Sequence, residues 1–488
     1  MRKWSVVLCL FATAAFAQNN NSKDPTWWDK YQYILNNGPA ASPGTTASVS
    51  TNGNVDVSNE CGPQSETYIT LNAANPKNLA GGSNEIFRLP MRGYFSTDGG
   101  KTWGGVDAPL PPPIGNGIDF GSDPSLAFDS YGNLYYSYIV VFFGNGNGIN
   151  GTEMGVARST DGGKSYGSVT FFDFAGGSDH FNDKPMITTD NAPNSPFRGN
   201  VYVAWDAASG GSTSGGIRVA RSTDHGATFT SVRADDPKGP GRVIGAQPFV
   251  GLNGELYVAW NDYAANTIAF NKSLDGGVTW GQQSVVAHKA LPFDIAIPAE
   301  SFRGALVYPS CDIDRSTSAH RGRLVCSWMD LTGSGTTDIF TAYSDNGGVT
   351  WSTPKTATDQ MSFPVDRFYN WISIDPTNGV VNISFYDTRN DTTGFRYMTD
   401  TYLSRSSDGG ATFAPNTRVS TVSSNEHDCG GLFPCSAINY GNQQGDYEGI
   451  VAYGGVAHPI WTDSRRNQQT VNGCNAPLME EVFSASVK

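Results

Sequence analysis

Short apolar runs recur along the chain, and each one begins with a glycine or asparagine turn. Most of the runs end in an aromatic residue followed by an acid, which is typical of a buried β-strand that follows a tight turn. The clear copies are RGNVYVAWDA (198–207), LNGELYVAWND (252–262), RGRLVCSWMD (321–330), NGVVNISFYD (378–387) and YGGVAHPIWTD (453–463), and YGNLYYSYIV (131–140) is a looser copy. This recurrence predicts an all-β chain built from repeated strand units.

A second pattern, Ser-x-Asp/Asn-x-Gly-x-Thr/Ser-aromatic, keeps register with the first. Its copies lie about 50 to 70 residues apart, which is the size of one four-stranded unit. The six boxes are STDGGKTW (96–103), STDGGKSY (159–166), STDHGATF (222–229), SLDGGVTW (273–280), SDNGGVTW (344–351) and SSDGGATF (406–413). The spacing predicts a β-propeller in which each box belongs to one blade.

The acid of each box has a mechanical interpretation, because a short acidic side chain can cap backbone N–H groups in a tight turn. In the fifth box Asn346 takes this place, and its amide oxygen can still accept those hydrogen bonds. A catalytic carboxylate would not tolerate that exchange. A structural role is therefore predicted for all six positions, which are Asp98, Asp161, Asp224, Asp275, Asn346 and Asp408. Two boxes also contain Gly-Gly-Lys-Thr/Ser, but Phe95 and Arg158 stand where a phosphate-binding loop needs glycine.

Counting the units favours seven blades, with six as the alternative. The last unit shows only three clear strands, and the segment near Val55–Ser58 could supply the fourth and seal the ring. The predicted organisation is a signal peptide over 1–17, an Asn/Ser/Gly-rich lead-in over 18–60 and a single propeller domain over 61–488. Within the lead-in, the aromatic stretch from Asp24 to Tyr31 could form one or two helical turns.

The first residues resemble an export signal, with Arg2 and Lys3 followed by an apolar run and by Ala-Phe-Ala ending at Ala17. Such a segment is removed in the mature protein. No later segment approaches the roughly 18 consecutive apolar residues that span a bilayer. A secreted or periplasmic protein cleaved near Ala17, without a membrane span, is predicted.

Six cysteines follow the predicted cleavage site, and an even number in an exported chain indicates disulfides. Sequence proximity and propeller geometry favour one set of pairs, in which the last pair clasps the two chain ends. The pairs are Cys311 with Cys326, Cys429 with Cys435, and Cys61 with Cys474. Free buried thiols are the alternative.

The formal net charge of −13 and the pI near 4.9 argue against nucleic acid, whose binders concentrate Lys and Arg on one face. The six histidines are widely spaced, so a zinc site has little support. The abundance of glycine and aromatic residues suits a surface for sugars or polar polymers. A glycan or glycoconjugate partner, a monomeric protein and no required cofactor are expected.

Candidate chemistry is sought on the propeller face where strand two ends and strand one begins. An Asp recurs at the strand-two end, and this repetition favours a turn cap or a salt bridge over a catalyst. These residues are Asp206, Asp262, Asp330, Asp387 and Asp463, and the strand-one starts add Asp123, Asp183, Lys184 and Asp446. The groups that do not repeat carry more information, and they are Arg367, Tyr369, Tyr447 and Glu448.

Boxes of this kind on a propeller scaffold resemble the sialidase (neuraminidase) superfamily, over nearly the whole mature chain. The resemblance implies three arginines that clamp a sugar carboxylate, a tyrosine nucleophile paired with a glutamate, and an aspartate acid/base. Carried over, these roles fall on Tyr447 or Tyr369 as nucleophile, Glu448 as its base, Asp446 or Asp183 as acid/base, and Arg88, Arg367, Arg389 and Arg465 as candidates for the clamp. Arg88 stands in Phe87-Arg88-Leu89-Pro90, which is similar to the family's Phe-Arg-Ile-Pro motif but lies closer to the first box.

Two functions from different classes follow. The first is a secreted sialidase-like glycoside hydrolase that acts on terminal sugars of glycans. The second is a non-catalytic propeller that binds a glycan or a protein, because similar boxes also occur in sorting receptors and binding propellers. In the second function a ring of Asp residues could hold a structural Ca²⁺ ion, a hard cation that prefers oxygen ligands.

Overall fold

The structure is a computed structural model. It describes residues 25–44, 46–51, 53–60, 62–115, 117–143, 149–176, 182–207, 216–236, 242–301, 303–427, 444–466 and 480–488. The predicted signal peptide over 1–17 lies outside the described residues, as do Cys61, Cys429, Cys435 and Cys474.

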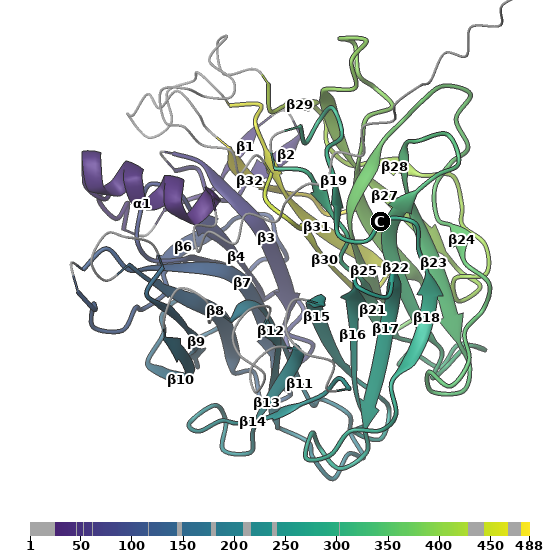
Figure 1. The fold of residues 1–488 in the computed structure, drawn as a ribbon, viewed down its shortest axis with the longest axis horizontal. Coiled ribbons are helices and arrows are strands. Elements are labelled where there is room, and N and C mark those ends of the chain that lie inside the picture. Colours follow the sequence, from purple (N-terminus) through teal and green to yellow (C-terminus); the bar gives the residue numbers. More distant parts are fainter. Residues whose placement is uncertain are drawn as a thin grey trace, which may run out of the picture.

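The described strands form seven antiparallel blades around a common axis, with the chain passing from one blade to the next in order (Figure 1). Blade one contains β3 (Gln64–Leu71), β4 (Leu79–Glu85), β5 (Arg92–Ser96) and β6 (Gly104–Asp107). Blade two contains β7 (Phe120–Phe128), β8 (Leu134–Phe142), β9 (Gly151–Ser159) and β10 (Ser168–Gly176). Blade three contains β11 (Asp183–Thr189), β12 (Val201–Ala207), β13 (Gly216–Ser222) and β14 (Thr230–Arg233).

The next three blades repeat this order, and two short extra pairings accompany them. Blade four contains β15 (Val243–Val250), β16 (Leu256–Asp262), β17 (Thr267–Ser273) and β18 (Ser284–His288). A two-stranded sheet of β19 (Asp294–Ile295) and β20 (Ala305–Leu306) precedes blade five, which contains β21 (Ser310–Ile313), β22 (Leu324–Leu331), β23 (Thr337–Ser344) and β24 (Lys355–Thr356). Blade six contains β25 (Arg367–Ile374), β26 (Val381–Asp387), β27 (Met398–Ser406) and β28 (Thr417–Arg418), and β29 (Ser424–Asn425) also pairs with β27.

Blade seven joins the two ends of the chain. Its C-terminal strands are β30 (Gly449–Tyr453), β31 (Val456–Asp463) and β32 (Glu481–Ser484), and its N-terminal strands are β1 (Val49–Thr51) and β2 (Asn54–Asp56). Strand β2 pairs with β32 through Val55 and Ser484. The sequence prediction that the segment near Val55 completes the last blade is confirmed, and the six-bladed alternative is wrong.

Helix α1 (Pro25–Asn37) packs beside the propeller at the upper left of Figure 1. It is longer than the one or two turns expected from the sequence. Its buried face carries Trp27, Tyr31 and Ile34, and the Tyr31 ring stacks on Phe143 of blade two at 4.5 Å. The lead-in thus supplies a helix against blade two as well as strands of blade seven.

The strand-two repeat forms the core of the blades. Its tryptophans are among the most deeply buried side chains of the described residues, and they are Trp205, Trp260, Trp328 and Trp461. The acids that follow these tryptophans form hydrogen bonds or ion pairs with neighbouring groups of the protein. Asp330 accepts hydrogen bonds from the backbone N–H groups of Ala290 and Leu291, and Asp463 forms an ion pair with Arg465.

The six boxes share one hydrogen-bonded turn. In the first box, Asp98 Oδ1 accepts from the backbone N–H groups of Lys101 and Thr102, each at 3.0 Å. In the fifth, Asn346 Oδ1 accepts from the Thr350 N–H at 2.9 Å, and its amide group donates to Thr350 Oγ1 at 2.8 Å. The turn therefore forms with or without the charge.

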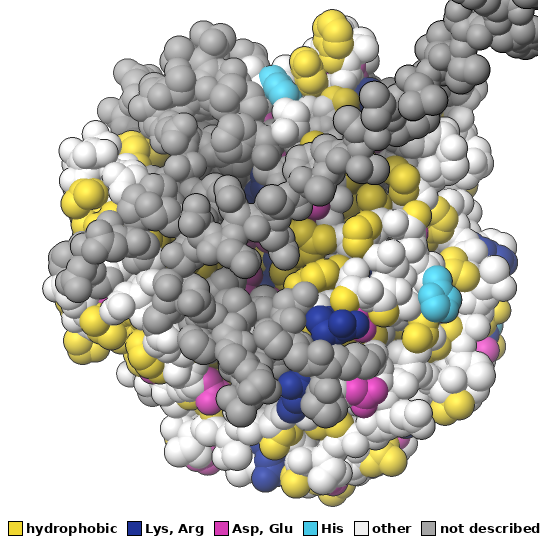
Figure 2. Space-filling view, in the orientation of Figure 1, with side chains coloured by type: hydrophobic (Ala, Val, Ile, Leu, Met, Phe, Trp, Pro, Cys, Tyr) yellow, Lys and Arg dark blue, Asp and Glu magenta, His cyan; other side chains and the backbone are white. Residues whose placement is uncertain are grey.

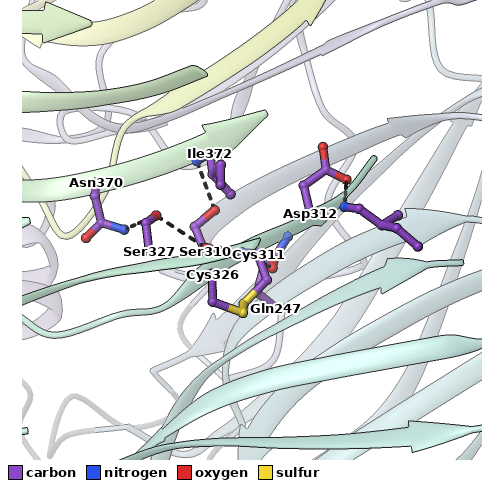
Figure 3. The surroundings of a disulfide bond; sticks show 9 residues. Gln247, Ser310, Cys311, Asp312, Cys326, Ser327, Asn370 and Ile372 are labelled. Carbon is purple, nitrogen blue, oxygen red and sulfur yellow. Dashed lines mark hydrogen bonds between the residues drawn. A yellow bond between two sulfur atoms is a disulfide. The ribbon is translucent and has the colours of Figure 1, made fainter. Parts of the chain in front are cut away.

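A disulfide joins Cys311 of β21 to Cys326 of β22, which are directly opposite residues of neighbouring strands (Figure 3). The predicted pairing of these two cysteines is confirmed. Gln247 of blade four accepts a hydrogen bond from the Cys311 backbone N–H at 2.8 Å. The bridge thus lies at the contact between blades four and five.

Charged side chains are scattered over the face seen in Figure 2, where Lys and Arg lie in separate places and some of them lie beside Asp or Glu. The described basic residues form no continuous basic surface on that face. Among the described residues, no helix is long and apolar enough to cross a membrane.

Candidate functional site

The first strands of five blades share an unusual backbone feature. In each, the pairing with the second strand shifts register at a bulge, and one residue of the bulge has a positive φ. These residues are Glu66 (53°), Asp123 (61°), Lys184 (53°), Gly245 (70°) and Tyr369 (51°). Tyr308 and Tyr447 occupy the matching places, two residues before the first paired residues of β21 and β30.

Side chains from this ring of positions meet near the propeller axis. The Lys184 ammonium of blade three lies 4.1 Å from the ring centre of Tyr308 before blade five and 3.8 Å from that of Tyr447 before blade seven. Residues of blades three, five and seven can meet only close to the axis. A positive φ is costly for any residue except glycine, and such strain is common at functional sites. The bulges therefore indicate a candidate functional site near the propeller axis.

A small pocket with a cavity volume of about 30 Å³ opens beside these residues. It lies between α1, the first strands of blades one to three, and the segments that precede blades five and seven. Its polar lining consists of Lys30, Glu66, Asn84, Ser122, Asp123, Asp183, Arg303 and Asp446, and its apolar lining includes Trp27, Ile86 and Phe120.

Arg303 connects two carboxyl groups of the pocket. Its Nε donates to Asp446 Oδ1 at 2.5 Å, and its Nη2 lies 3.5 Å from Glu66 Oε1. The other oxygen of Glu66 accepts from Asn84 Nδ2 at 2.7 Å. Arg303 comes from the segment between β19 and β20, so this segment brings a cation to carboxyl groups of two other parts of the ring.

Two further side chains contact the other carboxylate oxygen of Asp446. Lys184 Nζ lies 3.4 Å from Asp446 Oδ2, and the Tyr308 hydroxyl donates to the same atom at 3.3 Å. Asp446 is thus held by an arginine, a lysine and a phenol at once. Its position in space is fixed from three directions.

The environments of Glu66 and Asp446 move their pKa values apart. Burial would raise the pKa of Asp446, but the charges of Arg303 and Lys184 outweigh it and lower this pKa to about 2. Burial, and then the charges of Asp446 and Asp123, raise the pKa of Glu66 well above its usual 4.5. The site therefore favours an ionised Asp446 beside a protonated Glu66. Two carboxyl groups held in opposite states are the pattern of an acid and its partner in catalysis.

The structure places the residues named from the sequence in different surroundings. Asp446 and Asp183 line the pocket. Tyr447 is not among the described residues that line the pocket, and its hydroxyl donates to the Pro124 carbonyl at 3.0 Å. The Tyr369 hydroxyl donates to the Gly304 carbonyl at 3.0 Å. Both phenols are buried, and burial raises the pKa of each well above 10.0.

Tyr447 and Glu448 are not brought together as a nucleophile and its base. Neighbouring residues of an extended chain point to opposite sides. Tyr447 accordingly faces Lys184, whereas Glu448 is buried near Tyr386 of blade six, whose pKa it helps to raise after the effect of burial.

The four candidate arginines form ion pairs within single blades or at blade edges, and none of the four lines the pocket. Arg367 and Arg389 share Asp387 at 2.8 and 2.7 Å. Arg465 pairs with Asp463 at 2.6 Å. Arg88 is buried with Glu60, Glu85 and Asp107 at 3.3, 3.3 and 2.7 Å. The structure therefore does not assemble these four arginines into one clamp.

Glu66, Asn84 and Arg303 are pocket residues that the sequence analysis missed. A signal for Glu66 exists, because aligning the first strands places it at the same position as Asp123 and Lys184. Arg303 lies in a segment without a repeated counterpart, so no pattern points to it.

Within the described residues, no group of three or more His, Cys, Asp or Glu side chains is arranged to hold a metal ion. The structural Ca²⁺ ion stays a prediction.

No protein-family model and no curated protein sequence matches the chain. Among solved structures, similar folds include the intramolecular trans-sialidase from Ruminococcus gnavus, with 13% identity over 66% of this chain and 89% of that one at a TM-score of 0.47. The leech intramolecular trans-sialidase shares 13% identity over 79% of this chain and 71% of that one at a TM-score of 0.46. The NanB sialidase from Streptococcus pneumoniae shares 13% identity over 92% and 71% at 0.43. A likeness at this level gives no residue a role.

Proposed function

We propose that the protein is a glycoside hydrolase that acts on terminal sugars of glycans. The observation that carries the proposal is the pair of Glu66 and Asp446, bridged by Arg303 at the wall of a pocket. Hydrolysis of a glycosidic bond commonly uses one protonated and one ionised carboxyl group on either side of the scissile bond.

In this mechanism Glu66 donates its proton to the glycosidic oxygen as the bond to the anomeric carbon breaks. The ionised Asp446 stabilises the positive charge that develops on the sugar ring. Asp183, which lines the same pocket, accepts a proton from the water that attacks the anomeric carbon. Arg303 and Lys184 keep Asp446 ionised and in place, and Asn84 orients Glu66.

The test is an assay of the purified protein against aryl glycosides of neutral, amino and acidic sugars, the sialic acid glycoside included. Glu66→Gln is expected to abolish release of the aryl group. Glu448→Gln is the matched control, because Glu448 is an equally buried glutamate outside the pocket. Loss of turnover in Glu448→Gln with full turnover in Glu66→Gln would refute the assignment.

A second candidate is a propeller that binds a glycan without cleaving it. One observation favours it, because Asp446 already has three protein partners and a catalytic carboxylate needs to reach the substrate. Tight binding of a glycan without turnover of any glycoside would select this function.

We also propose that the protein is exported. The proposal is supported by the signal-like residues before Gln18 and by the disulfide between Cys311 and Cys326, since disulfides persist in oxidising compartments. N-terminal sequencing of the protein recovered from the culture medium or the periplasm tests it, and an intact Met1 in a cytosolic fraction would contradict it.

A further inference from the structure

The cations of the pocket are already engaged by the protein. Arg303, the one arginine that lines the pocket in the described part of the chain, contacts Asp446 and Glu66. Lys30 donates from its ammonium group to the backbone carbonyl of Glu85 at 2.5 Å. Lys184 lies between two tyrosine rings and contacts Asp446. Each of these cations thus already has an acceptor within the protein, which leaves it less able to bind a substrate carboxylate.

The carboxyl groups of the pocket outnumber its cations. Glu66, Asp123, Asp183 and Asp446 line it, and Arg303 and Lys30 are the basic residues that line it in the described part of the chain. Burial also lowers the pKa of Lys30 to about 7, so this amine is only partly charged at neutral pH. Even with Glu66 protonated, the carboxyl groups of Asp123, Asp183 and Asp446 outnumber the two lining cations, and like charges placed together oppose the binding of an acidic ring.

From this arrangement we infer that the pocket accepts a sugar ring without a negative charge, and that a ring with an ammonium group binds best. The inference rests on the proposed function and names its substrate class as neutral and amino sugars. A clamp for a sugar acid needs guanidinium groups that form bidentate pairs with the substrate. Here the guanidinium of the pocket has carboxylates of the protein as its partners.

The test compares three versions of one sugar ring, so that shape is held constant and charge varies. Aryl glycosides of glucose, glucosamine and glucuronic acid are assayed in both anomers, with the galactose series and the sialic acid glycoside alongside. The expected kcat/KM is highest for the amino sugar, and at least about 100-fold lower for the acid. Preference for a uronide or for the sialoside would overturn the inference while supporting hydrolysis.

Measurements of sugar binding distinguish a failure of this inference from a failure of the proposed function. If no glycoside is cleaved, hydrolysis is wrong, and calorimetry with free glucosamine, glucose and glucuronic acid then tests the inference alone. The same order of affinity supports it. Equal affinity for all three, binding of the acid alone, or no binding at all would overturn it.

A charge variant sharpens the result. Asp123→Asn removes one negative charge from the pocket wall with little change of shape, and it is expected to lower the ratio of glucosamine to glucuronate affinity by about 10-fold. Asp98→Asn changes the net charge of the protein equally but lies in a box turn, so its ratio should equal that of the wild type. An equal change of the ratio in both variants would show that the overall charge, and not the pocket, selects the ligand.

Discussion

The box turns and the strand-one bulges are two sets of equivalent positions on one scaffold, and they have opposite characters. The box acid makes the same hydrogen bonds in blade after blade, from Asp98 to Asp408. The bulge has the same backbone conformation in five blades, with one residue at positive φ. The side chain of that residue differs from blade to blade, as Glu66, Asp123 and Lys184 illustrate. Repetition of the side chain accompanies a structural role, whereas repetition of the backbone alone leaves the side chain free for chemistry.

The electrostatic environments differ in the same way. The Asp408 side chain is partly exposed, and although burial would raise its pKa, the hydrogen bonds from Thr412, Ser406 and the backbone together outweigh burial and lower the pKa to about 2. Glu66 is buried among other carboxyl groups, and its pKa is raised. The surroundings of a box acid such as Asp408 therefore favour its ionised form, whereas those of the bulge acid Glu66 favour its protonated form.

The largest expected effect is on turnover. Glu66→Gln removes the proton donor and should lower kcat on the best glycoside by about 10²- to 10⁴-fold, with a thermal unfolding midpoint close to that of the wild type. Asp98→Asn should leave kcat unchanged. Steady-state kinetics with calorimetric unfolding of both variants checks this, and equal losses of turnover would erase the distinction between the two regions.

The next effect is on stability. Asp446→Asn leaves Arg303 and Lys184 without their shared carboxylate, and breaking a buried ion pair costs about 3 to 5 kcal/mol. Urea unfolding should show this loss in the free energy of unfolding. Adding Arg303→Gln should restore part of it, because one uncompensated charge is then removed. A double variant less stable than the sum of the two single losses would contradict the account of this cluster.

The pH dependence of stability should also reflect the buried acids. Burial raises the pKa of Glu66, Glu300 and Glu448 well above their usual 4.5, so the stability that comes from protonating them is complete below pH 4.5 and is lost as the pH rises through their folded values. Asp446 acts in the opposite sense. Its stabilisation is present above its unfolded pKa of 3.8 and is lost as the pH falls through about 2.

The unfolding midpoint is therefore expected to be highest near pH 4 to 5 and to fall toward alkaline pH. Calorimetry from pH 3 to 9 measures it. Glu300→Gln should flatten the alkaline slope, because that side chain no longer ionises. A midpoint that rises steadily between pH 5 and 8 would contradict the buried, protonated state of these glutamates.

The smallest effect is expected in the boxes. Asp98→Ala removes a carboxylate that accepts hydrogen bonds from two backbone N–H groups. The free energy of unfolding should fall by about 1 kcal/mol, and turnover should not change. Asn346→Asp restores the acid of the other boxes and should change stability by less. Chemical unfolding of both variants measures these differences, and a loss of turnover in Asp98→Ala would give the box a role beyond the turn.

Local patterns explain which features the sequence could predict. The blades, the closure near Val55, the turns of the boxes and the Cys311–Cys326 pair each depend on residues near in sequence or on repeated strands. Asp183 and Asp446, which were named from the strand-one starts, line the pocket.

The contacts that build the site join distant parts of the chain. Arg303 and Glu66 are 237 residues apart, and Lys184 and Asp446 are 262 apart. No local pattern reports such a pair. The family resemblance carried the nucleophile to Tyr447 or Tyr369 and the clamp to four arginines, and the structure places these four arginines in ion pairs outside the pocket. The direction of successive side chains along a strand, which separates Tyr447 from Glu448, also depends on a register that only the folded chain defines.

Neutron diffraction from a deuterium-exchanged crystal at neutral pH can show which of the two carboxyl groups carries the proton, because it locates protons on individual carboxyl groups. A deuterium is expected on the Glu66 carboxyl group and none on Asp446. A Glu66 carboxylate without a deuterium, or a deuterium on Asp446, would contradict the opposite protonation states on which the proposed hydrolysis depends.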